Sequence, residues 1–281
     1  MVNMRRLLIS SVTRLSFWPS ISVRRIPALI LIFFLIDVAL GLGYIVNELF
    51  GRPYDKLTLL LDLSRESNLP TWYSSTQWFC VAIFLGLFAC SNFRLAQRRS
   101  WLLPLISLLF LALSVDEVAR IHEWLGEKTD ILLPGGSRTN TMVPETGIWM
   151  LVIGGPFLAA FVWLIFSIRP YFQGNRNALI KLFVGMLITL SGALGFETLT
   201  NFVVPGSMYG ILRVFSEEFC EIVGGTVVLW GSYELLLAHG FALSLAPVVL
   251  GSPAQKPSLY PTTPNNSKRK RALSNGRTRA A

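Results

Sequence analysis

Long runs of apolar residues, separated by short polar stretches, dominate the pattern of the chain. Six runs reach about 20 residues, the length that an α-helix needs to cross the hydrocarbon core of a bilayer. The runs cover residues 27–48, 73–93, 101–121, 147–168, 179–204 and 209–238. This pattern predicts an all-α integral membrane protein with six transmembrane helices.

The composition agrees with the hydropathy pattern. Hydrophobic residues make up 52% of the 281 residues and charged residues only 15%, whereas a soluble domain carries about 25% charge. The three cysteines form no C-x-x-C pair. Their number and spacing exclude a disulfide framework and a cysteine zinc site.

The positive charges predict the orientation of the helices. If the N-terminus lies inside, the inner segments carry 18 of the 25 basic residues and the outer segments carry 7. Because basic residues gather on the cytoplasmic side, both termini are predicted in the cytoplasm. The net charge of +9 is explained by this asymmetry, so we expect membrane lipids as partners and no nucleic acid.

The chain divides into three predicted parts. Residues 1–26 form a basic cytoplasmic segment, residues 27–240 a six-helix membrane domain, and residues 241–281 a basic, largely disordered cytoplasmic tail, because the tail has little apolar material to bury. The N-terminal segment lacks a small-residue cleavage site, so the first apolar run is expected to be kept as a signal anchor. The predicted location is the cytoplasmic membrane of a bacterium.

Acidic residues of three predicted helices fall at one depth, near the outer membrane face. These candidates for a ligand or ion cluster are Asp116, Glu117, Glu197, Glu217, Glu218 and Glu221. An ionisable side chain inside the bilayer costs about 2.5–3.5 kcal/mol, so such groups face the protein interior or a water-filled cavity. We therefore predict that five of them line one cavity open to the outside, namely Asp116, Glu117, Glu197, Glu218 and Glu221.

Helical periodicity predicts how the end of the third helix is arranged. At 100° per residue, Asp116, Arg120 and Glu123 share one stripe, which favours an ion pair between Asp116 and Arg120. His122 points away from this stripe unless the helix unwinds. Arg120, His122 and Glu123 are therefore predicted at the rim of the cavity, with Glu123 in headgroup water.

Three further expectations concern the surroundings of these acids. Arg213 precedes Glu217 by one helical turn and is a candidate partner for it. The loop acid Glu66 is expected in headgroup water, and Trp149 is expected in an interfacial aromatic belt. Small residues should let the fifth and sixth helices approach closely, namely Ser191, Gly192, Gly195, Gly224 and Gly225.

Two short segments carry a resemblance. Ser114, Asp116, Glu117, His122 and Glu123 form an S-x-D-E-x4-H-E pattern that resembles a motif of uncharacterised bacterial multi-pass membrane proteins, and "ESNLPTWYSS" at residues 66–75 resembles a second segment of that group. The resemblance implies no activity. The zinc-dependent alkaline-ceramidase-like hydrolases need three histidines, whereas this chain has only two.

Three hypotheses about function stay open at the level of the sequence. The first is a binding or transport protein whose acidic cavity takes a cation or a small cationic ligand. The second is an intramembrane enzyme acting on a lipid or quinone, in which carboxylates and His122 hold a divalent metal ion and Glu117 or Glu221 is the general base. The third is a structural or assembly protein in which Arg120 and Arg213 neutralise the acids.

Overall fold

The structure is a computed structural model. It describes residues 26–92, 99–138, 141–203 and 207–240. By its internal contacts the chain divides into Met1–Ala242 and Leu243–Ala281, and all described residues belong to the first unit. Most of the predicted N-terminal segment and the whole predicted tail lie outside the described residues.

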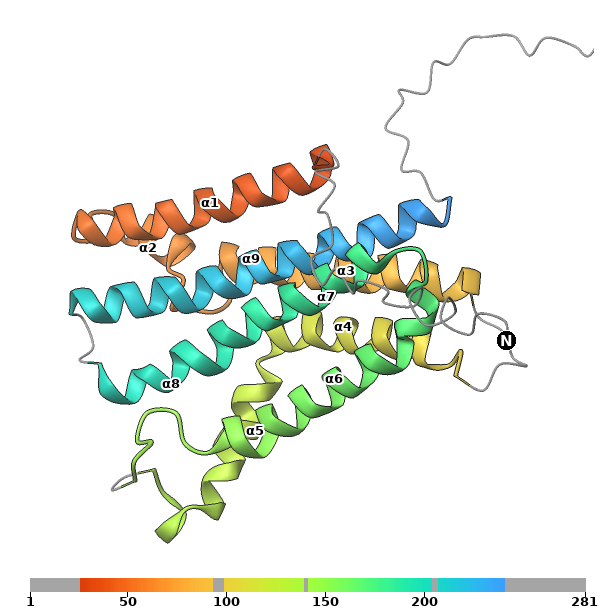
Figure 1. The fold of residues 1–281 in the computed structure, drawn as a ribbon. Coiled ribbons are helices and arrows are strands. Elements are labelled where there is room, and N and C mark those ends of the chain that lie inside the picture. The colour runs from red at the N-terminus through yellow and green to blue at the C-terminus, as the bar shows by residue number, and fades with distance from the viewer. Residues whose placement is uncertain (1–25, 93–98, 139–140, 204–206, 241–281) are drawn as a thin grey trace, which may run out of the picture. The chain divides into compact units, whose positions relative to one another are not determined.

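Six helical segments are long and apolar enough to cross a membrane (Figure 1). They are α1 (Ala28–Leu49), α3 (Leu69–Asn92), α4 (Leu102–Ala119), the composite segments Met150–Phe172 and Arg176–Phe202, and α9 (Met208–Ala238). The described part of the chain contains no strand. The predicted all-helical fold with six helices of spanning length is confirmed.

The two composite segments change their helical winding along their length. The first consists of η3 (Met150–Gly154), α6 (Gly155–Ile168) and η4 (Arg169–Phe172). The second consists of α7 (Arg176–Leu190), η5 (Ser191–Phe196), α8 (Glu197–Leu199) and η6 (Thr200–Phe202). Both η3 and η5 are π-helical turns, a feature that is frequent at functional sites.

The two π-helical turns contact each other through their side chains. A Cβ atom added at Gly154 would lie 2.9 Å from Cδ2 of Leu194. The Thr198 hydroxyl, one turn further along, lies 3.3 Å from the sulfur of Met150. The altered winding of both segments therefore lies beside Glu197, the first residue of α8.

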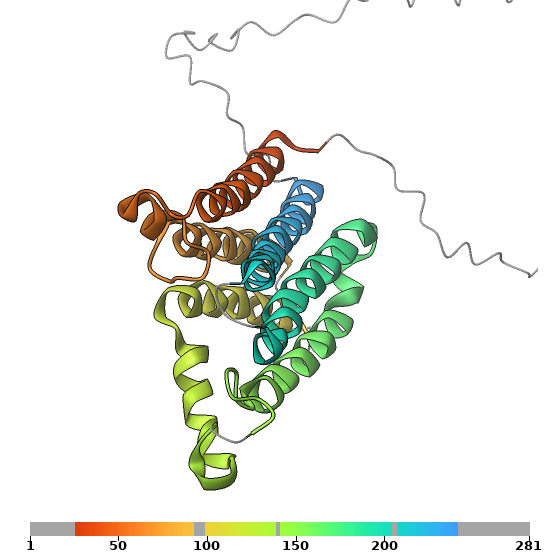
Figure 2. The same cartoon turned by 90° about the vertical axis from the view of Figure 1, so that its left-hand side faces the viewer.

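Short helices connect the long ones. The connection from α1 to α3 contains α2 (Asp55–Leu61). After α4 the chain forms α5 (Ile121–Thr129), η1 (Asp130–Leu132) and η2 (Pro134–Gly136). Figure 2 shows α5 leading away from the other helices at the end of α4.

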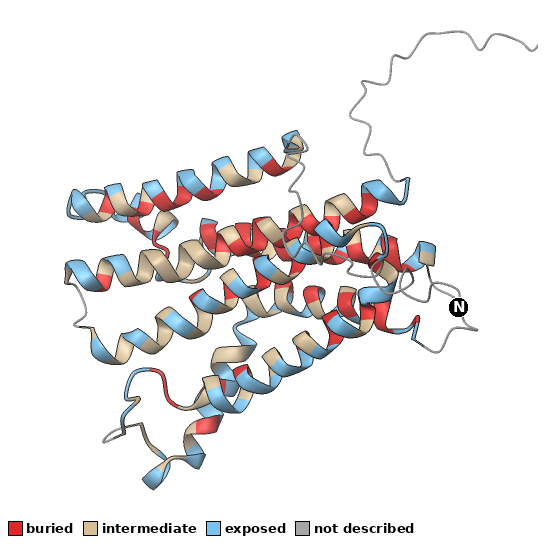
Figure 3. Ribbon diagram, viewed as in Figure 1, coloured by how far each residue is buried: buried red, intermediate tan, exposed pale blue. Residues whose placement is uncertain are grey.

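Helix α9 is the centre of the packing. It contacts α1, α3 and α7, while α3 packs against α4, and α4 against α6. Apolar side chains fill these contacts, for example Leu85, Phe110 and Leu229. Many residues on the outward faces of the helices are exposed (Figure 3), and large apolar residues are common among the exposed ones.

Glycines bring α7 and η5 against α9. A Cβ atom added at Gly224 would lie 2.6 Å from the backbone nitrogen of Thr189, and one at Gly192 would lie 2.6 Å from the carbonyl oxygen of Glu217. The predicted close approach is therefore present at these two glycines. Gly225 instead faces Gln77 of α3, and Gly195 has no atom within 4 Å of its added Cβ.

Candidate functional site

The chain breaks its helix at Arg120, between α4 and α5. Arg120 has left-handed backbone angles, with φ at 55° and ψ at 39°, and its N–H donates to the Asp116 carbonyl at 2.7 Å. A left-handed residue other than glycine costs about 1–2 kcal/mol. The Arg120 guanidinium offsets this cost by pairing with Glu123 and by lying 3.4 Å from Glu66.

The break turns His122 back toward Asp116. Asp116 accepts the backbone N–H of His122 at 2.8 Å, and its other carboxylate oxygen lies 2.8 Å from Nδ1 of the same residue. The predicted Asp116–Arg120 ion pair is therefore wrong, because the helix does not continue to Arg120. His122 was predicted to lie outside the cluster unless the helix unwinds. Helix α4 does end before His122, and the imidazole therefore lies against Asp116.

The pKa of His122 reflects these neighbours. Burial alone would lower the pKa of the imidazole, but the hydrogen bond to Asp116 and the charges of Asp116, Glu123 and Glu66 outweigh burial and raise it. A protonated His122 is thus favoured beside an ionised Asp116.

Glu66, from the connection before α3, joins the same group. Burial raises the pKa of Glu66 to about 7, and its hydrogen bond with Glu123 acts in the same direction. For Glu123, burial is outweighed by the bonds to Arg120 and Glu66, which lower its pKa. Glu66 and Glu123 therefore lie together beside Arg120, an arrangement that favours a proton between the two carboxyls.

Four carboxyls from three spans form the centre of the site. Glu221 is within range of the charges of Glu218, Glu117 and Glu197. Glu117 accepts a hydrogen bond from Ser74 of α3. All four remain partly accessible rather than fully buried. We call Glu117, Glu197, Glu218 and Glu221 the central carboxyls.

Ion pairs neutralise the neighbours of the central carboxyls but not these four residues. Arg213 pairs with Glu217 one turn along α9, as the spacing predicts, and their side chains are only 16% and 13% exposed. Asp116 has His122, and Glu123 has Arg120. Within the described ranges, none of the central carboxyls forms a salt bridge.

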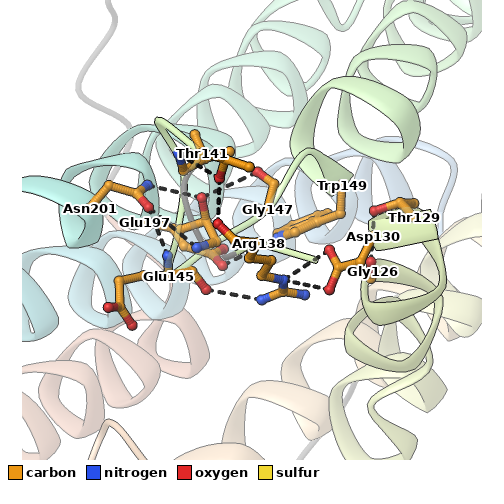
Figure 4. A network of polar contacts seen from close by, with 12 residues as sticks. Gly126, Thr129, Asp130, Arg138, Thr141, Glu145, Gly147, Trp149, Glu197 and Asn201 are labelled. Carbon is orange, nitrogen blue, oxygen red and sulfur yellow. Dashed lines mark hydrogen bonds and ion pairs between the residues drawn. The ribbon is translucent and has the colours of Figure 1, made fainter. Parts of the chain in front are cut away.

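The connection between α5 and η3 packs over Glu197 (Figure 4). Arg138 donates to both carboxylate oxygens of Asp130, at 2.9 and 2.7 Å, and to the Glu145 carbonyl at 3.0 Å. Asn201 of η6 accepts the Glu145 N–H at 3.0 Å. These contacts tie the connection to the end of the fifth span.

The same connection places Trp149 at the site. Its indole N–H donates to Glu197 at 3.3 Å, and its ring lies 5.8 Å from the His122 ring, measured between centroids. The sequence assigned Trp149 only to an aromatic belt. Its role at the site depends on contacts between residues about 50 positions apart, for which the hydrophobic pattern carries no signal.

The arrangement of ligand atoms does not resemble a metal centre. In the part of the chain that the structure describes, no three His, Cys, Asp or Glu side chains are grouped so that they could hold a metal ion. The carboxyls are instead distributed over α4, α8 and α9. The predicted divalent ion therefore finds no matching ligand set among these residues.

Comparison with known proteins identifies a family. The model of a family described as a domain of unknown function, DUF8692, matches residues 28–237. The chain belongs to this family. The match runs from the first residue of α1 to the last turn of α9 and includes every acid discussed above. No curated protein and no solved structure is significantly similar to the chain.

Membership of DUF8692 assigns no activity. The resemblance to bacterial multi-pass membrane proteins, drawn from residues 66–75 and the S-x-D-E-x4-H-E pattern, therefore stays a prediction. Function has to be argued from the chemistry of the site.

Proposed function

We propose that the chain is a multi-pass protein of a bacterial cytoplasmic membrane, with six spans and both termini in the cytoplasm. Six helices of spanning length and their exposed apolar faces support insertion. The excess of basic residues in the proposed inner segments, 18 against 7, supports the orientation. In this orientation the central carboxyls lie near the outer face.

We further propose that the central carboxyls bind a small cationic ligand from the outside. The observation that carries the proposal is their mutual proximity without a salt bridge to any basic residue in the described ranges. Like charges at short range repel, and a proton or a bound cation relieves that repulsion. A site of this kind is selective for cations and exchanges them for protons.

An organic cation fits the site better than a metal ion does. A metal ion needs ligand atoms that converge on one point, and no such group is present among the described residues. An organic cation instead spreads its charge over several carboxyls, and the indole of Trp149 next to Glu197 offers an aromatic surface for it. For the same reason the alternative of a carboxylate–metal enzyme has no supporting geometry.

A purely structural role explains only part of the site. The pairs Arg213–Glu217 and Arg120–Glu123 fit a structural protein, because each neutralises a charge near the membrane interface. The central carboxyls are not explained in this way, since none of them forms a salt bridge with a described arginine. We propose in addition that the protein, having bound the cationic ligand, takes it up across the membrane.

A thermal-shift titration in detergent tests the binding proposal. Tetramethylammonium chloride should raise the melting temperature more than sodium chloride at equal ionic strength, because a ligand of the folded state stabilises that state. Glu218→Gln and Glu221→Gln should reduce or abolish the difference. The control Glu127→Gln removes a charge from an exposed residue of α5 and should keep it.

Two results would overturn the proposal. One is an equal shift with tetramethylammonium and sodium in the wild type. The other is a tetramethylammonium shift that survives unchanged in both Glu218→Gln and Glu221→Gln, because the cation would then bind elsewhere. Transport is tested separately, by uptake of the radiolabelled cation into proteoliposomes with and without a pH gradient.

A further inference from the structure

A second carboxyl site lies apart from the central carboxyls, in the middle of α1. Asp37 is 0% exposed, although its side chain is ionisable. The Tyr73 hydroxyl lies 2.6 Å from Oδ1 of Asp37 and 2.9 Å from the Phe33 carbonyl, and Gln77 Nε2 lies 3.3 Å from the same Oδ1. The site is thus enclosed by side chains from α1 and α3.

Helix α9 closes the site from the third side. Gln77 Nε2 lies 2.7 Å from the Thr226 hydroxyl and 3.2 Å from the Ile222 carbonyl. Thr226 is itself 0% exposed. A Cβ atom added at Gly225 would lie 2.9 Å from Gln77 Oε1, so the glycine leaves room for the amide against the α9 backbone.

The side chains that act on Asp37 in the described ranges carry no positive charge. The side chains that act on it are Tyr73, Thr226 and Gln77, of which only Tyr73 is titratable. None of the salt bridges in the described ranges includes Asp37. An ionised carboxylate without a partner is among the most costly groups to bury inside a protein or a bilayer.

Two oxygen atoms of this site have no hydrogen-bond partner, Asp37 Oδ2 and Gln77 Oε1. Both are acceptors when Asp37 is ionised. Turning the Gln77 amide over would remove the donor from Asp37 Oδ1 and set Oε1 against the Ile222 carbonyl, which is also an acceptor. A proton on Asp37 Oδ2 turns one of these two unpaired acceptors into a donor.

We propose that Asp37 is a proton-binding site that is occupied at neutral pH. The proton turns the buried carboxylate into a neutral acid, and it turns the unpaired Oδ2 from an acceptor into a donor. Gln77 connects this site to α9, since Ile222 directly follows Glu221 of the central carboxyls. The occupancy of Asp37 therefore biases the α9 backbone beside Glu221, whichever ligand binds there.

Infrared spectroscopy tests this proposal, because only a protonated carboxyl shows the carboxylic C=O stretch. The difference spectrum between the purified wild type and Asp37→Asn at neutral pH should contain that band. The matched control is Glu234→Gln, because Glu234 is also within a span but pairs with Lys181 at 2.7 Å. Its difference spectrum should show loss of a carboxylate band instead.

A second variant covers the case in which Asp37→Asn does not fold. Tyr73→Phe removes the hydrogen bond at 2.6 Å but keeps the ring, so the protonated C=O band should move to higher frequency and keep its intensity. The proposal is overturned if Asp37→Asn folds and removes no protonated band. It is also overturned if Tyr73→Phe leaves the protonated bands unshifted.

Discussion

Asp116 holds His122 by two contacts of 2.8 Å, one to the backbone N–H and one to the imidazole, across the helix break at Arg120. The first contact satisfies one of the N–H groups that the start of α5 leaves without a helical partner. The second orients the imidazole next to Trp149. One carboxylate therefore both begins a helix and positions the residues that surround Glu197.

The break itself gives a first prediction, from two substitutions at Arg120. Both Arg120→Gly and Arg120→Ala remove the contacts to Glu66 and Glu123. Glycine adopts φ of 55° without strain, whereas alanine does not. Arg120→Ala should therefore unfold more easily than Arg120→Gly by about 1 kcal/mol, measured by denaturant unfolding in detergent. Equal stability would mean that the left-handed conformation is not maintained.

The helices were largely predictable because each apolar run has the length of a bilayer-spanning helix. The six apolar runs match the observed helices to within a few residues at most ends. The break at Arg120 was not predictable, because no proline or glycine marks it. It is stabilised by tertiary contacts from Glu66, which lies more than 50 residues earlier. The periodicity argument that paired Asp116 with Arg120 fails for this reason.

The sequence predicts a common depth for the acids of the candidate site but not their contacts. The rule that acids in a membrane face inward predicts a group that includes Glu117, Glu197 and Glu221, and in the structure the charges of Glu117 and Glu197 act on Glu221. The contributions of Trp149 and Glu66 depend on how two connections fold back on the helices. The hydrophobic pattern of a connection does not determine that arrangement.

A second prediction concerns the pH dependence of stability through His122. Its pKa is raised in the folded protein above the ordinary value of 6.5. The contribution of His122 to stability is therefore complete below 6.5 and is lost as the pH rises through the folded value. The advantage of the wild type over His122→Gln should shrink between about pH 6 and pH 9. Thermal unfolding of both proteins at the two pH values measures this stability advantage. A constant or growing advantage would contradict a charged Asp116–His122 pair.

A third prediction follows from Glu66, whose pKa rises from 4.5 to about 7 on folding. Between these values the unfolded chain loses a proton that the folded protein keeps, so stability decreases as the pH rises and is constant above about 7. Glu66→Gln lacks this decrease. Relative to the wild type, the free energy of unfolding of Glu66→Gln should rise by about 1–2 kcal/mol across that interval. This value is reduced for the 28% exposure of Glu66 and for the opposite contribution of Glu123.

Denaturant unfolding at pH 5 and pH 8 measures the difference, with Glu127→Gln as the control for a lost charge on α5. If Glu66→Gln and the wild type change in parallel between these pH values, Glu66 is ionised in the folded protein and does not share a proton with Glu123.

A fourth prediction tests the proposed orientation. In a variant without Cys80, Cys90 and Cys220, the three free cysteines, single cysteines are introduced as Lys128→Cys and Arg176→Cys. A membrane-impermeant maleimide added to spheroplasts should label Lys128→Cys at once, because α5 is proposed to lie outside. Arg176→Cys should react only after permeabilisation. The reverse pattern would place the central carboxyls at the cytoplasmic face.

The last prediction uses two glycines of the same π-helical turn, η5. A Cβ atom at Gly192 would lie 2.6 Å from the Glu217 carbonyl oxygen and 2.9 Å from Cγ of Glu221, whereas one at Gly195 meets no atom within 4 Å. Gly192→Ala should therefore destabilise the protein by about 1–3 kcal/mol, as overpacking does. Gly195→Ala should be neutral or stabilising by up to about 1 kcal/mol, because alanine restricts the unfolded chain.

The same pair separates packing from binding at the site. The displacement required by Gly192→Ala moves η5 away from Glu217 and Glu221, so it should also weaken the thermal shift produced by tetramethylammonium. Gly195→Ala should retain that shift in full. If Gly192→Ala were as stable as the wild type and kept the whole shift, the close contact between η5 and α9 would have no part in arranging Glu221 toward Glu197 and the other central carboxyls.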